Sequence, residues 1–395
     1  MIRKVFPLYV IAALVFGACQ PAVLNAAGYS IATYTPTAVQ PAPALTATAQ
    51  PIPVGWKSEV VAEGLEVPWS IIFTSAERML VSERPGRIRE IVDGKLNPNA
   101  LYTFTDLVSI EESGLMGLAL DPDYAENHFF YACYTSQNQS GMFNRVVRMI
   151  DKGNEISLDA VVVDNIPSAK YHAGCRLAFG PDGKLYITSG DARQPQAAQD
   201  LSSLAGKILR VNPDGSIPQD NPFRDSLVFS YGHRNPQGIT WNSTDGIFYE
   251  SEHGPSGNDG PAGGDEINRI EAGSNYGWPL VSHDESLAGT QSPLMQFTPA
   301  IAPAAILFYS SATLPLFQGK LLLGALRGEG LAMLSPAVDD PNRIEKVEWL
   351  VRDVGRVREV SAGPDGTIYF STSNRDGRGN PRTGDDKIYR ITPVY

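Results

Sequence analysis

The sequence has little charge, few cysteines and no basic run. Charged residues make up 19% of the 395 residues, three residues are cysteines and five are histidines. With a net charge of −11 and no stripe of lysine or arginine, the chain is poorly suited to nucleic acid as a bulk partner. An anionic ligand would therefore have to be held by a local cluster of cations.

Several cofactor and catalytic motifs are also missing. No Gly-x-Gly-x-x-Gly joins a strand pattern to a helix pattern, and no Walker loop occurs, which argues against nicotinamide and nucleotide cofactors. The chain has neither a Gly-x-Ser-x-Gly elbow nor a His/Cys cluster with zinc spacing.

The N-terminal 54 residues have the pattern of a targeting segment followed by a tether. Two basic residues precede an apolar run over residues 5–16, and two small residues precede Cys19. This predicts a signal peptide over 1–19 of the lipoprotein type, with a lipid on Cys19 as the membrane anchor; a plain signal peptide with an incidental cysteine is the alternative. Residues 20–54 are uncharged and rich in Ala, Pro and Thr, which predicts a disordered tether. The protein is then expected outside the cytoplasm, in the periplasm or on the cell surface.

Cys133 and Cys175 are the two remaining cysteines. In an oxidising compartment they could form a disulfide, but two buried thiols are an equally good interpretation. Their spacing does not decide between the two.

What the chain has in abundance is glycine, with 37 residues, and proline, with 30, in a weak repeat that starts at Trp56. A strand-like apolar run, often introduced by an Asp-Gly turn, recurs about every 45 to 75 residues. Residues 180–183 and 363–366 both read Gly-Pro-Asp-Gly and both precede similar strand patterns. Six copies predict an all-β fold over 55–395, a six-bladed β-propeller with four-stranded antiparallel blades. Loops from every blade would converge on one mouth of the central channel.

Residues 228–279 carry the densest set of candidate functional groups. Arg234-Asn235 follows one apolar run, His253-Gly254-Pro255 follows the next, and Asp265-Glu266 and Tyr276 come after them. Turn chemistry accounts for Gly, Asn and Pro, but it does not call for an Arg-Asn pair beside His and Asp-Glu. Loops at strand ends commonly carry function on a rigid scaffold, so this stretch is expected to contribute to a site.

Other blades contribute further candidates: Glu112, His172, Arg327, Arg356 and Arg358. His172 stands ahead of a strand, where its imidazole could act as a base near neutral pH; a loop histidine with a structural hydrogen bond is the alternative. Arg356 and Arg358 share one face of a strand at i, i+2. They would repel each other unless an anion or a carboxylate lay between them, and a surface-exposed pair is the alternative.

Hard oxygen ligands indicate a calcium site. The turn at His253-Gly254-Pro255 offers backbone carbonyls, and the side chains of Asp265, Glu266 and Asn268 offer oxygen atoms. Ca²⁺ prefers oxygen-rich sites of this kind.

Taken together, the motifs resemble those of the soluble PQQ-dependent glucose and aldose sugar dehydrogenases. GLMGLALDPDY, HAGCRLAFGPDGKLYITSGD, GHRNPQGI, EHGP, GGDEIN, NYGWP and RVREVSAGPDGTIYFSTS occur in the family's order, and the resemblance extends over about residues 56–393. It implies a propeller that holds pyrroloquinoline quinone (PQQ) and Ca²⁺ over its channel. It also implies oxidation of aldoses at C1 to the lactone, with hydride transfer to the quinone and an unidentified electron acceptor.

The resemblance also implies roles for single residues. His172 would be the general base and Arg234 would assist at the reacting carbonyl. Gly254 and Pro255 would bind the Ca²⁺ of the quinone through their carbonyls. The implied cofactor contacts are Glu112, Arg234, Asn235, Arg327, Arg356 and Arg358, and the implied neighbours of a second, structural Ca²⁺ are Asp265, Glu266 and Tyr276.

Some positions depart from the glucose enzymes. Glu112 and His253 stand where those enzymes have glutamine, and Tyr171 replaces an acidic sugar contact. The segment SGNDGPAG lengthens the loop after EHGP. These changes favour a broader aldose range over glucose specificity. Two other functions are compatible with a propeller: calcium-dependent hydrolysis of the lactonase kind and non-enzymatic binding.

Overall fold

The computed structural model describes residues 53–340 and 342–395. The predicted signal peptide over 1–19, its Cys19, and all but the last two residues of the tether predicted over 20–54 lie outside the described residues. Within the described ranges, no helix is both long enough and apolar enough to cross a membrane.

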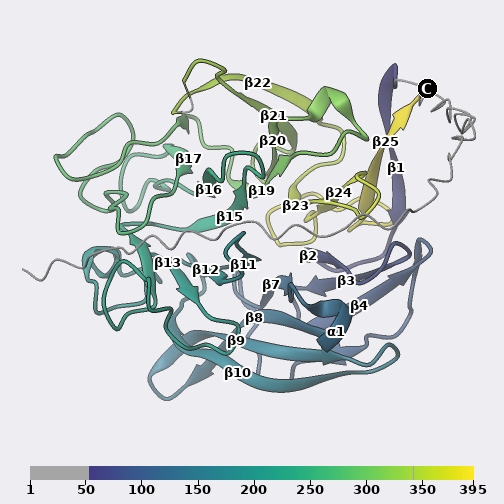
Figure 1. The fold of residues 1–395 in the computed structure, drawn as a ribbon, viewed down its shortest axis with the longest axis horizontal. Helices are drawn as coiled ribbons and strands as arrows, with labels where there is room; N and C mark the ends of the chain where they lie inside the picture. Colours follow the sequence, from purple (N-terminus) through teal and green to yellow (C-terminus); the bar gives the residue numbers. More distant parts are fainter. Residues whose placement is uncertain (1–52, 341) are drawn as a thin grey trace, which may run out of the picture. The chain divides into compact units, whose positions relative to one another are not determined.

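The predicted six-bladed β-propeller is confirmed, because the strands pair into six antiparallel sheets placed around a common centre (Figure 1). Blade 1 contains β2 (Pro68–Phe73), β3 (Arg78–Glu83), β4 (Arg87–Val92) and the short β5 (Lys95–Leu96) and β6 (Tyr102–Thr103), which both pair with β4. Blade 2 contains β7 (Leu115–Leu120), β8 (Phe129–Asn138), β9 (Gly141–Asp151) and β10 (Ile156–Pro167). Blade 3 contains β11 (Gly174–Phe179), β12 (Leu185–Ser189), β13 (Lys207–Val211) and β14 (Val228–Tyr231).

The second half of the ring has the same construction. Blade 4 contains β15 (Pro236–Trp241), β16 (Phe248–Glu252), β17 (Asp265–Arg269) and β18 (Met295–Phe297). Blade 5 contains β19 (Pro303–Tyr309), β20 (Lys320–Ala325), β21 (Gly330–Pro336) and β22 (Ile344–Val351). Blade 6 contains β23 (Val357–Ala362), β24 (Ile368–Thr372), β25 (Ile388–Val394) and β1 (Gly55–Ala62). Helical structure in the described residues is limited to α1 (Tyr124–Asn127) and two 3-10 turns, Pro195–Gln199 and Pro315–Phe317.

The ring closes by pairing strands from opposite ends of the described chain. β1 is antiparallel to β25, with Gly55 opposite Val394. The first strands of the six blades contact one another in ring order, including β23 with β2. These inner strands are buried on both faces because each sheet packs against two neighbouring sheets, whereas β10 and β22, the outermost strands of blades 2 and 5, are partly exposed.

The two Gly-Pro-Asp-Gly segments make equivalent turns between the first and second strands of blades 3 and 6. In each turn the leading glycine N–H donates to a residue four positions on, at 2.9 Å from Gly180 and 2.7 Å from Gly363. Gly183 and Gly366 have φ of +69° and +78°, a region that glycine adopts without strain. The repeat seen in the sequence therefore reflects a repeated hairpin.

Cys133 on β8 and Cys175 on β11 form a disulfide. It joins blades 2 and 3 inside one hydrophobic cluster. Cys175 is three residues after His172 in the chain. The question that the cysteine spacing left open is answered by the fold, which brings the two strands side by side.

Candidate active site

A cavity of about 340 Å³ lies at the end of the ring where the first strand of each blade begins and the second strand ends. All six blades contribute to its wall, mainly through the segments just before the first strands and just after the second strands. Six arginines and four carboxylates line it, so the cavity is cationic although the chain is acidic. These charged residues are Arg84, Arg234, Arg327, Arg356, Arg358, Arg378, Glu111, Glu112, Asp265 and Asp376.

His172 is held on the cavity wall by a buried carboxylate. Its Nδ1 lies 2.7 Å from Oδ1 of Asp191, and Asp191 Oδ2 accepts a hydrogen bond from Trp278 Nε1 at 2.8 Å. Nε2 of His172 has no hydrogen-bond partner among the described residues. A carboxylate that accepts from Nδ1–H leaves Nε2 as the free, basic nitrogen, so the ring is oriented for general-base work.

The backbone around His172 depends on glycine. His172 itself has φ of +59°, in the left-handed region, and such strain is concentrated at functional sites. A Cβ on Gly190 would lie 2.0 Å from the His172 carbonyl oxygen. The glycines in HAGC and SGD therefore allow the two loops to approach closely enough for the His172–Asp191 contact.

Glu112 lies beside the histidine and carries a charge that a glutamine would lack. Its Oε2 accepts the His172 backbone N–H at 2.9 Å and the Asn235 side-chain amide at 3.2 Å. Burial alone would raise the pKa of this carboxyl, but His253, His172 and Arg378 and the hydrogen bond from the His172 N–H together outweigh burial and lower the pKa to about 2. Glu112 is therefore ionised at neutral pH.

Among the described residues, Arg358 is a buried cation without a carboxylate partner. Its Nη1 donates to Gln237 Oε1 at 2.7 Å, but its Nε has no partner within the described ranges and the residue is 4% exposed. Burial lowers the pKa of Arg358 to about 9, and the nearby Arg356 adds to this effect. Arg356, by contrast, pairs with Asp376 through Nε at 2.8 Å. An anion entering the cavity would meet Arg358, whose charge is offset only by the carboxylates of Asp376 and Glu112, which lie nearby without forming an ion pair with it.

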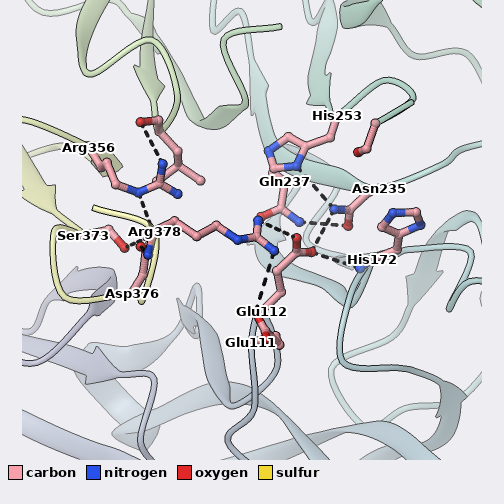
Figure 2. A network of polar contacts seen from close by, with 12 residues as sticks. Glu111, Glu112, His172, Asn235, Gln237, His253, Arg356, Ser373, Asp376 and Arg378 are labelled. Carbon is pink, nitrogen blue, oxygen red and sulfur yellow. Dashed lines mark hydrogen bonds and ion pairs between the residues drawn. The ribbon is translucent and has the colours of Figure 1, made fainter. Parts of the chain in front are cut away.

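Figure 2 shows a polar network that crosses the cavity. Arg378 extends from the side of Asp376 and Arg356 toward Glu112, whose Oε1 lies 3.3 Å from Arg378 Nη1. On the other side Gln237 donates to Asn235 Oδ1 at 3.0 Å and accepts from Arg358. The implied cofactor contacts and the implied base are therefore linked by one chain of hydrogen bonds and ion pairs.

A second group of carboxylates lies next to the cavity, on β16 and β17. The strand register sets Glu250 opposite Asn268 and Glu252 opposite Glu266, and single oxygens of Glu250 and Glu252 come within 4.8 Å of a His233 ring nitrogen. The buried Glu250 Oε1 and Asn268 Oδ1 have no partner among the described residues. Burial, and then the charge of Glu252, raise the pKa of Glu266 to about 8 and that of Glu250 well above its ordinary value.

Comparison with known proteins decides the family. The family model described as Glucose / Sorbosone dehydrogenase matches residues 65–380. The chain belongs to this family. Aldose sugar dehydrogenase YliI of Escherichia coli is 32% identical over 344 residues, which cover 81% of this chain and 90% of that protein.

Two solved structures support the membership. A Thermus protein described as an oxidoreductase (glucose dehydrogenase) is 41% identical, with a TM-score of 0.79 over 85% of this chain and 100% of that one. The PQQ-bound aldose sugar dehydrogenase of Streptomyces coelicolor is 33% identical, with a TM-score of 0.75 over 87% and 99% of the two chains.

Most residues that the family resemblance indicated share the cavity. The implied residues that line it are Glu112, His172, Arg234, Asn235, Gly254, Pro255, Asp265, Arg327, Arg356 and Arg358. Glu266 and Tyr276 instead line a small adjoining cavity of about 20 Å³, together with Glu252. The predicted metal neighbours therefore fall into two groups. Asp265 accepts backbone N–H groups of Gly254, Ile301 and Ala302 at 2.9, 2.7 and 2.7 Å, and the Tyr276 hydroxyl donates to the Arg269 carbonyl.

Sequence reasoning missed several members of this family site. Arg378 and Asp376 follow β24 as Asp191 follows β12, so the repeated strand pattern could have pointed to them. Arg84, just after β3, has the same placement. In the sequence, Glu250 and Glu252 are only alternate residues of a strand, and no sequence pattern predicts that they pair with residues of β17.

Proposed function

We propose that the protein oxidises aldose sugars at C1 to the lactone, with PQQ and Ca²⁺ as cofactors. The observation that carries the proposal is the His172–Asp191 pair on the wall of a cationic cavity. The PQQ-bound Streptomyces relative and the aldose sugar dehydrogenase of Escherichia coli support the choice of cofactor and substrate class.

The residues of the cavity fit a quinone that carries several carboxylates. Arginine suits carboxylates because its planar guanidinium donates two parallel hydrogen bonds. Arg358 has a buried donor that no described residue uses, and the exposed Arg327 side chain has no hydrogen bond within the described ranges. We assign Arg356, Arg358 and Arg327 to the cofactor carboxylates. Arg234 and Asn235 are assigned to the region of the reacting carbonyl.

His172 acts on the sugar in this proposal. Its Nε2 takes the proton of the anomeric hydroxyl, while Asp191 holds the Nδ1–H tautomer and stabilises the imidazolium that forms. PQQ, when bound, would supply the hydride acceptor for C1, and the protein supplies orientation and electrostatics. Glu112, ionised and beside the base, is placed to accept a hydrogen bond from a sugar hydroxyl. An external electron acceptor would complete the cycle.

Two calcium sites belong to the proposal. The carbonyls of Gly254 and Pro255 on the cavity wall would contact the ion that accompanies the quinone. Glu250, Glu252 and Glu266 all accept hydrogen bonds from the Asn268 side-chain amide. Glu250 Oε1 and Asn268 Oδ1 have no partner among the described residues, and these oxygens would fit a structural Ca²⁺. Glu266 also belongs to the set that the family resemblance implies, together with Asp265 and Tyr276, and that set stays a prediction.

Reconstitution tests the function. Purified protein titrated with PQQ and Ca²⁺ should show saturable binding by absorbance and should then reduce an artificial electron acceptor when given aldoses. Protein that fails to bind the quinone, or that binds it and oxidises no aldose in a broad panel, contradicts the proposal. Lactone hydrolysis by quinone-free protein would support the hydrolytic alternative instead.

Calcium should weaken the pH dependence of stability. Because the folded-state pKa of Glu266, about 8, lies above its ordinary value of 4.5, its contribution to stability is present below about pH 4.5 and is lost as the pH rises through 8. Metal-free protein should therefore melt at a lower temperature at pH 9 than at pH 6. Ca²⁺, which binds ionised carboxylates, should raise the melting temperature more at pH 9.

Thermal melts with EDTA or CaCl₂ between pH 5 and pH 9 measure this effect. Glu266→Gln should flatten the pH dependence and remove most of the calcium response, whereas the exposed Glu271→Gln should keep both. A chelator that changes nothing at pH 9 would count against the site.

Location outside the cytoplasm and a lipid on Cys19 stay predictions of the N-terminal sequence. The Cys133–Cys175 disulfide supports an oxidising compartment, where such bonds persist.

A further inference from the structure

The loop between β16 and β17, residues 253–264, folds onto Arg234. Asp259 Oδ2 accepts hydrogen bonds from Arg234 Nε at 3.0 Å and from Nη2 at 2.7 Å. Nη2 also donates to Ser256 Oγ at 3.1 Å, and Nη1 donates to the His253 carbonyl at 3.0 Å. The enlarged SGNDGPAG segment thus supplies most of the contacts of an arginine on the cavity wall.

The same loop holds Asp259 in place. Its Oδ1 accepts the Ser256 N–H at 2.9 Å, and the Gly263 N–H donates to the Pro255 carbonyl at 3.1 Å. Gly260 has φ of +150°, and a Cβ there would lie 3.1 Å from Pro255 Cβ. The Asp259 side chain is 10% exposed and that of Arg234 is 3% exposed, so this ion pair is largely shielded from water.

These contacts leave Arg234 with little freedom. A guanidinium has five N–H donors, and four are used within the loop, which leaves one on Nη1. The Trp278 ring, 5.5 Å away, covers one side of the group. Arg234 is therefore set in one orientation before any ligand binds, which lowers the ordering cost of binding.

We infer that Asp259 is a positioning residue for Arg234 and that it sets the effective charge which Arg234 presents to the cavity. A carboxylate in direct contact cancels part of the field of a guanidinium, and it does so more strongly where water is excluded. Without Asp259, Arg234 would stabilise negative charge on a reduced quinone more strongly. The charge-setting part of this inference rests on the proposed function, whereas the positioning part does not.

Hydrogen exchange on the quinone-free protein tests the positioning. Asp259→Ala should speed exchange of the Arg234 Nε–H, read by NMR, by roughly ten- to a hundredfold, because its charge-assisted hydrogen bond to Asp259 is lost. Asn258→Ala is the matched control, since Asn258 is exposed and makes no hydrogen bond with the described residues. Exchange in Asp259→Ala equal to wild type would overturn the positioning role.

The reduction potential of the quinone-loaded protein tests the charge. Asp259→Asn keeps the size of the side chain and removes its charge, so it should shift the midpoint potential to more positive values, while Asn258→Ala should not. An unchanged potential in Asp259→Asn, with quinone bound, overturns the charge-setting role. If the wild type binds no quinone, the proposed function and this role both fail, and hydrogen exchange still decides the positioning.

Discussion

Replacing His172 by glutamine should lower aldose turnover by roughly 10²- to 10⁴-fold, which is the usual contribution of a positioned general base. Of the two ring nitrogens of His172, only Nε2 has no hydrogen-bond partner among the described residues, because Nδ1 lies 2.7 Å from Oδ1 of Asp191. Glutamine has no basic nitrogen, so the anomeric proton would have to leave without a positioned acceptor. Steady-state kcat with a saturating aldose measures the loss.

Quinone binding separates this effect from general damage. The dissociation constant of PQQ, read by absorbance, should stay within a few-fold of wild type, because none of the assigned cofactor contacts is removed. The exposed His128→Gln should leave both kcat and affinity unchanged. Turnover near the wild-type level in His172→Gln would show that another group is the base.

Arg358→Met should have opposite effects on the two forms of the protein. In the quinone-free protein it removes a buried cation that has no carboxylate partner in the described part of the chain, so stability should be unchanged or higher. In the loaded protein it removes a buried partner of a cofactor carboxylate, a loss of about 2–5 kcal/mol. The dissociation constant of PQQ should therefore rise by about 30- to 5,000-fold.

Arg356→Met is the matched control for stability. It leaves the buried Asp376 without its ion pair, which costs about 3–5 kcal/mol when one partner of such a pair is removed. Thermal melts of the quinone-free variants should therefore show a lower melting temperature for Arg356→Met alone. Equal destabilisation by both substitutions would mean that Arg358 is a structural residue.

Much of this fold could be predicted from sequence because local signals repeat. The Gly-Pro-Asp-Gly turns recur before similar strands, and six copies of a strand pattern give six blades whose loops meet at one end. That geometry is enough to bring Glu112, His172 and Arg358 together, although they are far apart in sequence. Residue types at strand ends were therefore informative without knowledge of any side-chain contact.

The rest depends on register and on loop conformation. Glu252 meets Glu266 only because β16 and β17 pair in one register across a twelve-residue loop. The same loop returns Asp259 to Arg234, and no local pattern predicts that path. Arg356 and Arg358 looked equivalent in sequence. Among the described residues, however, Arg356 pairs with the carboxylate of Asp376, whereas Arg358 contacts only Gln237 and no carboxylate. The difference arises because the segment after β24 brings Asp376 to the cavity beside Arg356.

The pairing of β1 with β25 has a consequence for biosynthesis. The first strand of the described chain to be made must wait for almost the last one, since Gly55 lies opposite Val394. Arg356, Arg358 and Asp376 also belong to the final blade. The sixth blade is therefore completed only when both ends of the described chain are present, and a chain interrupted before residue 388 would have five complete blades and a β1 without its partner strand.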